Sequence, residues 1–254
     1  SGVSVLAGLA GGIDQGFSGL LPGAIYYDAS YKTYGGDSAV STGGGPVHAL
    51  IPADPGFAQQ WQLDNTLFAE IDINVTDVWD EFTGAGVLVG IIDDGIDYNH
   101  PDLIFNYRFD LDLDARDLDD DAFASGNDDF HGTAVAGILH KIAPEAEIGN
   151  FRVLGAFKEA RSSVIRAGAR LAIDRGYDIL NCSFGCPGKA EFVMSFKSWI
   201  DEAYIRGVHV VAACNNQDYS IAEWPAHFPS AISVTRTAGR ARGKGRAAVA
   251  ASAR

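Results

Sequence analysis

Apolar residues recur in two alternating patterns between residues 87 and 214. Short runs rich in β-branched residues predict buried strands, and longer runs with apolar positions every three or four residues predict helices. The predicted strands are 87–93, 147–154, 178–184 and 208–214, and the predicted helices are 132–141, 158–175 and 190–206. This alternation is typical of an α/β fold with parallel strands and right-handed helical crossovers. We therefore expect a parallel β-sheet flanked by helices on both faces, in three layers.

The rest of the chain lacks these periods. Residues 1–48 are rich in Gly, Ser and Tyr, which predicts an N-terminal leader or linker. Residues 236–254 turn basic and carry no acidic side chain, which predicts a disordered or misread tail. The folded unit is therefore expected to span residues 49–235.

Two segments far apart in sequence carry the groups of an acid–base pair. The strand 87–93 ends in Asp93-Asp94-Gly95, at the sheet edge where open α/β folds bind ligands. His131 precedes a small, apolar helical run, so its imidazole is expected at a helix N-terminus, where imidazolium is disfavoured unless a carboxylate compensates. Asp93 is the candidate carboxylate. Asp before His is one chain order of the serine-hydrolase triad, in which Asp orients the imidazole and His takes the proton of the nucleophile.

A third marker follows the last predicted strand. The run 208–214 ends in Cys214, followed by the side-chain amide of Asn215. An amide N–H at a strand end can stabilise the negative oxygen of a tetrahedral intermediate. Asn215 is therefore the predicted oxyanion donor.

These blocks resemble the signatures of the subtilisin-like serine proteases, the subtilases of the peptidase S8 family. The similarity extends from about Asp54 to about Thr235. Three blocks resemble the kexin-like branch: Asp-Pro-Gly-Phe-Ala-Gln-Gln-Trp at 54–61, Asp-Asp-Gly-Ile-Asp at 93–97 and His-Pro-Asp-Leu at 100–103. Cys214 departs from the pattern, because the family usually has Gly there.

The resemblance implies a serine endopeptidase that acts on polypeptide substrates. Asp93 and His131 would be two members of its catalytic triad. Ser183, Phe184 and Gly185 lie where the family pairs its backbone with an extended substrate, which is a form of strand addition. Secretion is the expected localisation.

The third member of the triad, the nucleophilic serine, has no match in this chain. The family carries it in a Gly-Thr-Ser-x-Ala motif after the Asn strand, and none of the later serines has that context: Ser220, Ser230, Ser233 and Ser252. The peptidase domain is therefore expected to be truncated at its C-terminal side and nearly inactive as it stands. The alternative is a non-catalytic, calcium-dependent peptide-binding or scaffold protein, a pseudoprotease.

Calcium is the predicted cofactor. Nine aspartates and one arginine lie between residues 110 and 129, and such a loop can supply the several oxygens that Ca²⁺ requires. The spacing is not that of an EF-hand, and a solvated acidic loop is the alternative. The resemblance implies five candidate ligands: Asp54, Asp102, Asp110, Asp112 and Asp114.

Composition excludes some other functions. The net charge of −14 argues against nucleic-acid binding, which needs a basic face. No apolar run approaches the roughly 20 residues of a membrane span, and the sequence does not predict an oligomeric state. A metal-dependent hydrolase built from Asp93, Asp94 and His131 ranks last, because adjacent carboxylates on a strand point to opposite faces.

Overall fold

The computed structural model describes residues 57, 60, 62–65, 72–126, 129–155, 161–186, 190–214 and 224–235. The predicted leader and tail lie outside these residues, as do two predicted site residues, Asp54 and Asn215. No helix in the described part is long and apolar enough to cross a membrane.

A six-stranded sheet forms the centre of the fold, and its strands follow the order β2-β3-β1-β4-β5-β6. Every pairing between these strands is parallel. The strands are β1 (Leu88–Asp93), β2 (Leu113–Asp114), β3 (Glu147–Arg152), β4 (Ile179–Cys182), β5 (His209–Ala213) and β6 (Ile232–Val234). The helices are α3 (His131–Ile142), α4 (Ser162–Asp174) and α5 (Ala190–Ile205).

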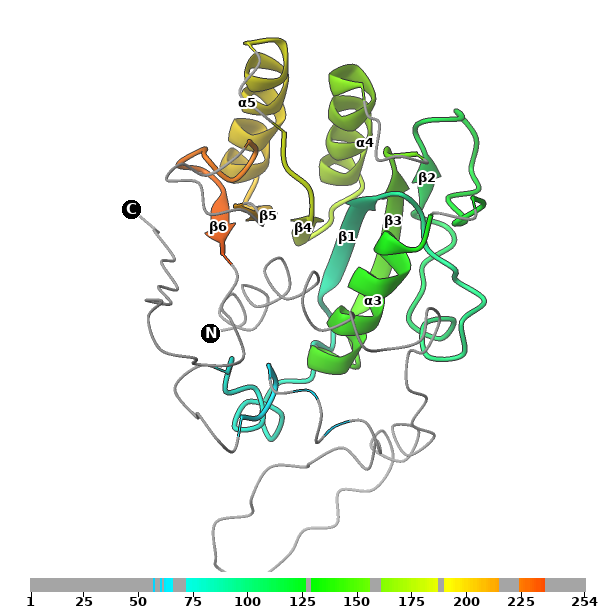
Figure 1. The fold of residues 1–254 in the computed structure, drawn as a ribbon, viewed down its shortest axis with the longest axis vertical. Coiled ribbons are helices and arrows are strands. Elements are labelled where there is room, and N and C mark those ends of the chain that lie inside the picture. The colour runs from blue at the N-terminus through cyan, green and yellow to red at the C-terminus, as the bar shows by residue number, and fades with distance from the viewer. Residues whose placement is uncertain are drawn as a thin grey trace, which may run out of the picture.

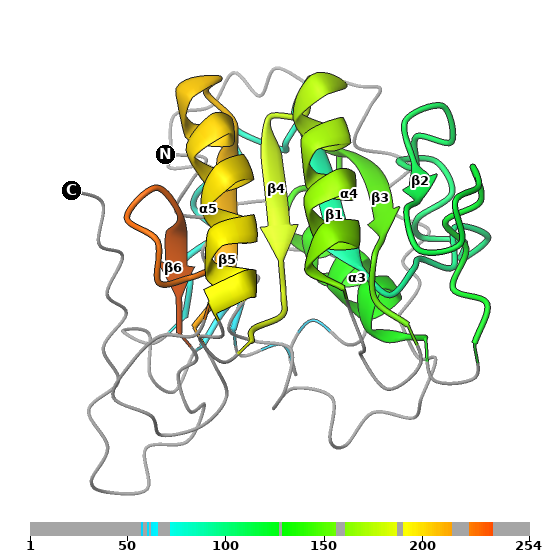
Figure 2. The same cartoon turned by 90° about the horizontal axis from the view of Figure 1, so that it is seen from above.

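Helices cover both faces of the sheet, which confirms the predicted three-layer α/β architecture. Figures 1 and 2 show α3 on one face and the neighbouring helices α4 and α5 on the other. Side chains alternate along β1: Val89 and Ile91 belong to the core on the α3 side, and Ile92 belongs to the core beneath α4 and α5. All three are no more than 1 % exposed, so the central strand is buried on both faces, as parallel strands of this class usually are.

The four predicted strands correspond to β1, β3, β4 and β5. The predictions missed β2 and β6, which have only two and three residues and so show no measurable period. Because the strands are parallel, their carboxyl ends meet at one edge of the sheet. The ends of β3, β1 and β4 are neighbours there, and they deliver Arg152, Asp93 and Cys182 to the same region.

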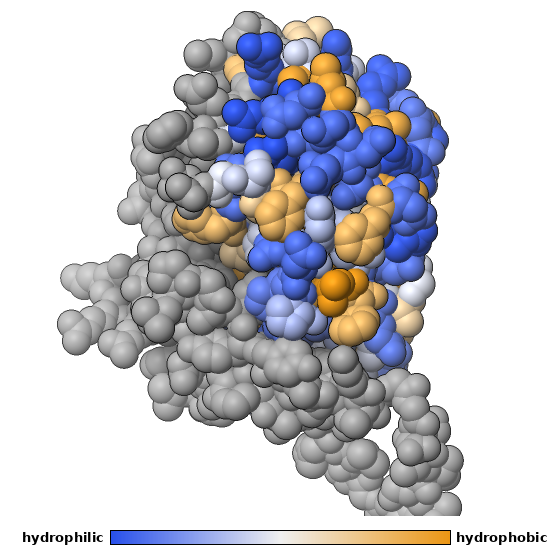
Figure 3. All heavy atoms as spheres, turned by 90° about the vertical axis from the view of Figure 1, so that its right-hand side faces the viewer, coloured by the Kyte–Doolittle hydropathy of each residue, from blue (hydrophilic) through white to orange (hydrophobic). Residues whose placement is uncertain are grey.

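The loops around β2 form a mainly polar side of the molecule. Figure 3 shows this side as hydrophilic surface interrupted by separate hydrophobic groups. Exposed Phe105, Phe109 and Leu118 come from this part of the chain. The rings of Tyr98, Tyr107 and Phe109 pack together with centroids 4.9–5.2 Å apart.

Candidate active site

Asp93 and His131 meet at the carboxyl end of β1. Asp93 is the last residue of that strand and His131 the first residue of α3. The imidazole Nδ1 of His131 lies 2.8 Å from Oδ1 of Asp93, although 38 residues separate them in sequence. Asp93 is completely buried, and the His131 side chain keeps 17 % of its surface exposed. The structure therefore brings this predicted pair together, with the carboxylate inside and the imidazole at the surface.

Asp94 fixes the start of α3. Its Oδ1 accepts a hydrogen bond from the Gly132 N–H at 2.7 Å, and its Oδ2 accepts one from the His131 N–H at 3.2 Å. The first N–H groups of a helix have no partner within the helix, so a carboxylate there stabilises the helix N-terminus. Burial and the nearby Asp93 carboxylate nevertheless raise the pKa of Asp94 to about 6. Asp94 thus acts as a helix cap supplied from the segment that follows β1, a role that sequence spacing did not predict.

Gly132 lets the helix approach the strand end closely. A Cβ atom at this position would lie 2.3 Å from the backbone carbonyl oxygen of Gly95 and 3.2 Å from the Cβ of Asp93. The next residue, Thr133, accepts a hydrogen bond from the Asp97 N–H at 2.8 Å through its hydroxyl. The Gly and the Thr after His131 therefore attach α3 to the turn that follows β1.

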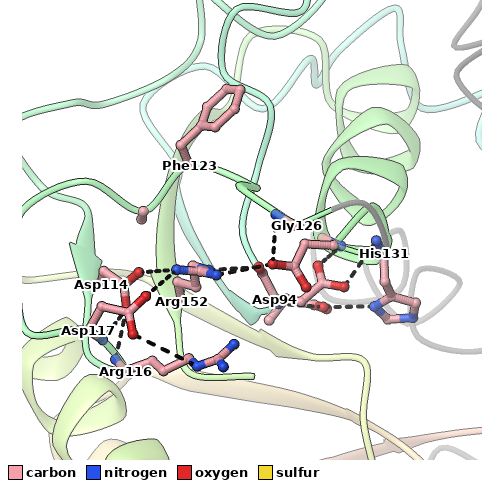
Figure 4. Close-up of polar contacts among 12 residues, drawn as sticks. Asp94, Asp114, Arg116, Asp117, Phe123, Gly126, His131 and Arg152 are labelled. Atoms are coloured by element: carbon pink, nitrogen blue, oxygen red, sulfur yellow. Dashed lines mark hydrogen bonds and ion pairs between the residues drawn. The ribbon is translucent and has the colours of Figure 1, made fainter. Parts of the chain in front are cut away.

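Arg152, which the sequence analysis did not single out, lies beside this pair. It is 5 % exposed and donates hydrogen bonds to Asp114, Asp117 and Asp129. Its Nε also donates to the backbone carbonyl of Asp94 at 3.1 Å. Figure 4 shows the guanidinium between Asp114 and Asp117 on one side and the Asp94 segment, with His131 beyond it, on the other. An arginine at the end of a buried strand in an acidic chain was the sequence signal for this cluster.

The predicted substrate segment leaves the same edge of the sheet. Ser183, Phe184 and Gly185 follow β4, which pairs with β1 and β5. The side chain of Asn181 donates to the Ser183 hydroxyl at 2.9 Å, and the Phe184 ring packs 6.4 Å from that of Phe196 on α5. Ser183 is partly exposed and Gly185 exposed, so part of this segment is accessible from outside.

The departure at Cys214 is accommodated by β6. Its backbone N–H donates to the carbonyl of Val234 at 2.8 Å, and its Sγ lies 2.7 Å from the hydroxyl oxygen of Ser233. The side chain therefore faces the neighbouring strand. The amide of Asn215 lies outside the described residues, and its role as oxyanion donor stays a prediction.

Three of the aspartates predicted to bind calcium have different partners in the described structure. Asp110 forms a two-point contact with Arg108 at 2.9 and 2.8 Å, and Asp112 accepts a hydrogen bond from the Tyr107 hydroxyl at 2.8 Å. The Asp114 carboxylate accepts from the Arg152 guanidinium and from two backbone N–H groups. Within the described ranges, no group of three or more His, Cys, Asp or Glu side chains is placed to hold a metal ion.

This geometry has two consequences for metal chemistry. Arginine guanidinium groups contact Asp110 and Asp114 and supply positive charge there, and the role of these aspartates and of Asp112 as calcium ligands stays a prediction. The contacts do not favour the metal-dependent hydrolase hypothesis, since Asp93 contacts an imidazole while Asp94 contacts backbone N–H groups. Asp102 is buried, at 8 % exposure, and stays a candidate ligand together with Asp54.

We predict that Gly132→Ala destabilises the protein by about 1–3 kcal/mol, the usual cost of overpacking, because the added methyl meets a backbone oxygen that cannot rotate away. The control is Gly168→Ala in α4, where the nearest atom at 2.9 Å is a Val153 methyl that can shift. Urea unfolding of both variants measures the difference. Equal stability of the two variants would contradict the proposed close approach of α3 to β1.

We also predict opposite pH dependences for two neighbouring aspartates. Burial raises the pKa of Asp112 from 3.8 to about 6, so its ionised form opposes folding, and Asp112→Asn should become more stable relative to the wild type as the pH rises from 4 to 7. The hydrogen bonds from Arg108 lower the pKa of Asp110, so its ionised form favours folding. Asp110→Asn should therefore become less stable relative to the wild type as the pH rises to about 4, and should change little more between pH 4 and 7. Urea midpoints across both intervals test this, and a gain for Asp110→Asn like that of Asp112→Asn would refute it.

The described geometry agrees with the comparisons to known proteins. The profile of the subtilase family of S8 peptidases matches residues 84–247. Mouse neuroendocrine convertase 2 is 30 % identical over 221 residues, covering 73 % of this chain and 34 % of the convertase. Rat furin is 41 % identical over 102 residues, covering 39 % of this chain and 13 % of furin. The chain thus spans about a third of the length of neuroendocrine convertase 2.

Solved structures support the same fold. A cold-adapted subtilisin-like serine proteinase superposes with a TM-score of 0.51 at 23 % identity, over 63 % of this chain and 57 % of that chain. A lanthipeptide protease superposes with a TM-score of 0.55 at 22 % identity, over 62 % and 51 % of the two chains. With the family profile and the kexin-like relatives, these findings confirm the resemblance seen in the motifs. The chain belongs to the subtilase family of serine endopeptidases.

Proposed function

We propose that this chain contributes the acid and the base of a subtilisin-like serine endopeptidase, with Asp93 as the orienting acid and His131 as the general base. The observation that carries the proposal is the 2.8 Å contact between Asp93 Oδ1 and His131 Nδ1. This contact favours the tautomer with the proton on Nδ1, which leaves Nε2 able to accept a proton. The fully buried carboxylate also stabilises the imidazolium that forms during the reaction.

The chemistry follows from this arrangement. Nε2 of His131 removes the proton of a serine hydroxyl as the serine oxygen attacks the scissile carbonyl carbon. The C–N bond then breaks, and the imidazolium returns the proton to the leaving amine. Water then replaces the amine: His131 removes a proton from the water as it attacks the acyl carbon, the bond to the serine oxygen breaks, and the imidazolium returns the proton to that oxygen. The amide of Asn215 is the proposed donor to the oxyanion.

An extended polypeptide is the proposed substrate, bound along Ser183–Gly185. The Phe184 side chain packs towards α5, so the backbone groups of the segment would pair with the substrate. This segment follows β4 and Asp93 ends the adjacent strand, which would direct a bound peptide towards the acid–base pair. We also propose a secreted or secretory-pathway location, by similarity to the kexin-like relatives.

The nucleophile is proposed to come from sequence that follows Arg254. Loss of the triad serine alone costs on the order of a million-fold in turnover, so residues 1–254 by themselves should be nearly inactive. A chain extended through the downstream coding sequence should react with a fluorophosphonate probe. The probe forms a covalent bond to the activated serine oxygen and releases fluoride.

In the extended chain, Asp93→Asn should lower turnover by about ten-thousand-fold, because the amide favours the wrong imidazole tautomer. The matched control is Asp174→Asn, an exposed aspartate at the end of α4 that contacts Arg206, and it should leave turnover unchanged. Peptide hydrolysis and probe labelling measure both variants. A folded, extended chain that resists the probe would favour the non-catalytic peptide-binding alternative instead.

We propose that calcium binds through Asp54 and Asp102, by similarity to the kexin-like branch. Asp102 suits such a role because it is a largely buried carboxylate, and carboxylate oxygens are ligands that Ca²⁺ prefers. Calcium should raise the melting temperature relative to a chelator, since a ligand that binds only the native state stabilises it. Asp102→Asn should abolish this shift and Asp174→Asn should retain it. Equal melting of the wild type with calcium and with chelator would refute the site.

A further inference from the structure

Arg152 occupies a central position behind the acid–base pair. It ends β3 directly opposite Asp93, whose Cα is its partner in the parallel register. The backbone carbonyl of Asp93 accepts hydrogen bonds from the N–H groups of Val153 and Leu154 at 2.9 and 3.1 Å. The end of β3 therefore holds the strand end that carries the orienting acid.

The guanidinium of Arg152 extends this support to the next residue. Its Nε donates to the Asp94 carbonyl at 3.1 Å. Nη1 donates to Asp114 at 2.5 Å and Asp117 at 2.8 Å, and Nη2 donates to Asp129 at 3.0 Å. A planar guanidinium with several directed donors can hold these groups in one geometry, which a lysine ammonium cannot do.

Asp94 connects this cluster to His131. Its carbonyl is held by Arg152, while its carboxylate accepts from the His131 and Gly132 N–H groups. The backbone position of His131 therefore depends on the orientation of Asp94, and that orientation depends on Arg152. All of these groups except the imidazole and Asp117 are at most 8 % exposed, so solvent cannot easily replace the contacts.

We propose that Arg152 is a positioning residue for the acid–base pair, and that it acts through Asp94 to hold the N-terminus of α3 so that the His131 imidazole faces Asp93. This inference rests on the proposed function of Asp93 and His131. Arg152 and its aspartate partners then position the acid–base pair, in addition to stabilising the loop at residues 110–129.

Histidine-labelled protein of residues 1–254 allows a test by NMR that does not require the serine. The wild type should show a downfield Nδ1 proton for His131, assigned by its loss in His131→Gln. Arg152→Met should broaden or remove this proton signal. It should also accelerate hydrogen exchange of the Gly132 N–H by about tenfold or more, because the helix start loses its fixed cap.

Two further variants separate positioning from folding and from charge. Arg152→Lys keeps a positive charge among the aspartates, so it should fold, but it lacks the Nε–H that holds the Asp94 carbonyl and should also lose the signal. Arg175→Met is the matched control: Arg175 donates to the carbonyls of Leu111 and Asp112 in the same acidic region, and its loss should leave the His131 signal unchanged.

The route through Asp94 predicts non-additivity. Once Asp94→Ala has removed the cap, adding Arg152→Met should change the exchange rate of the Gly132 N–H little further. Folded Arg152 variants with an unchanged Nδ1 proton signal would overturn the inference, as would an equal loss in Arg175→Met. Absence of the signal in the wild type would instead count against the proposed function itself.

Discussion

The site depends on the meeting of one strand end with one helix start. The N-terminus of α3 carries partial positive charge, which favours carboxylates and disfavours an imidazolium. Asp93 and Asp94 both lie there. Asp93 contacts the imidazole of His131, and Asp94 caps the first backbone N–H groups of the helix. A single carboxylate could not do both, because Asp94 uses both of its oxygens on N–H groups.

Burial makes the two adjacent carboxylates energetically costly. Asp93 and Asp94 lie side by side at 0 and 2 % exposure, and an isolated buried charge is costly unless polar groups satisfy it. Backbone N–H groups satisfy Asp94, while the imidazole and the Asp94 N–H satisfy one oxygen of Asp93. The raised pKa of Asp94 shows that the compensation is incomplete. Such residual cost is expected where function, and not stability, selects the residues.

Sequence reasoning succeeded where a residue's position follows from a regular element. The run 87–93 predicted a buried parallel strand, and the strand placed Asp93 at the sheet edge. The predicted helix after residue 131 placed His131 at its N-terminus, and the sequence motifs indicated that His131 pairs with Asp93. Arg152 could not be predicted in this way. Its partners lie between 23 and 58 residues away, in irregular segments or in the two-residue strand β2, where periodicity gives no position.

The acidic loop, residues 110–129, shows why the roles of loop residues are harder to predict from a family resemblance than the roles of residues at strand ends. Its aspartates contact Arg108 and Arg152, and Arg175 holds two of its backbone carbonyls, so described protein cations neutralise much of the segment. A guanidinium and a calcium ion can each satisfy the charge of a carboxylate. Aspartate density therefore predicts that a cation is needed, without predicting which one. Near the proposed acid–base pair, that cation is an arginine whose donors also reach the backbone of the site.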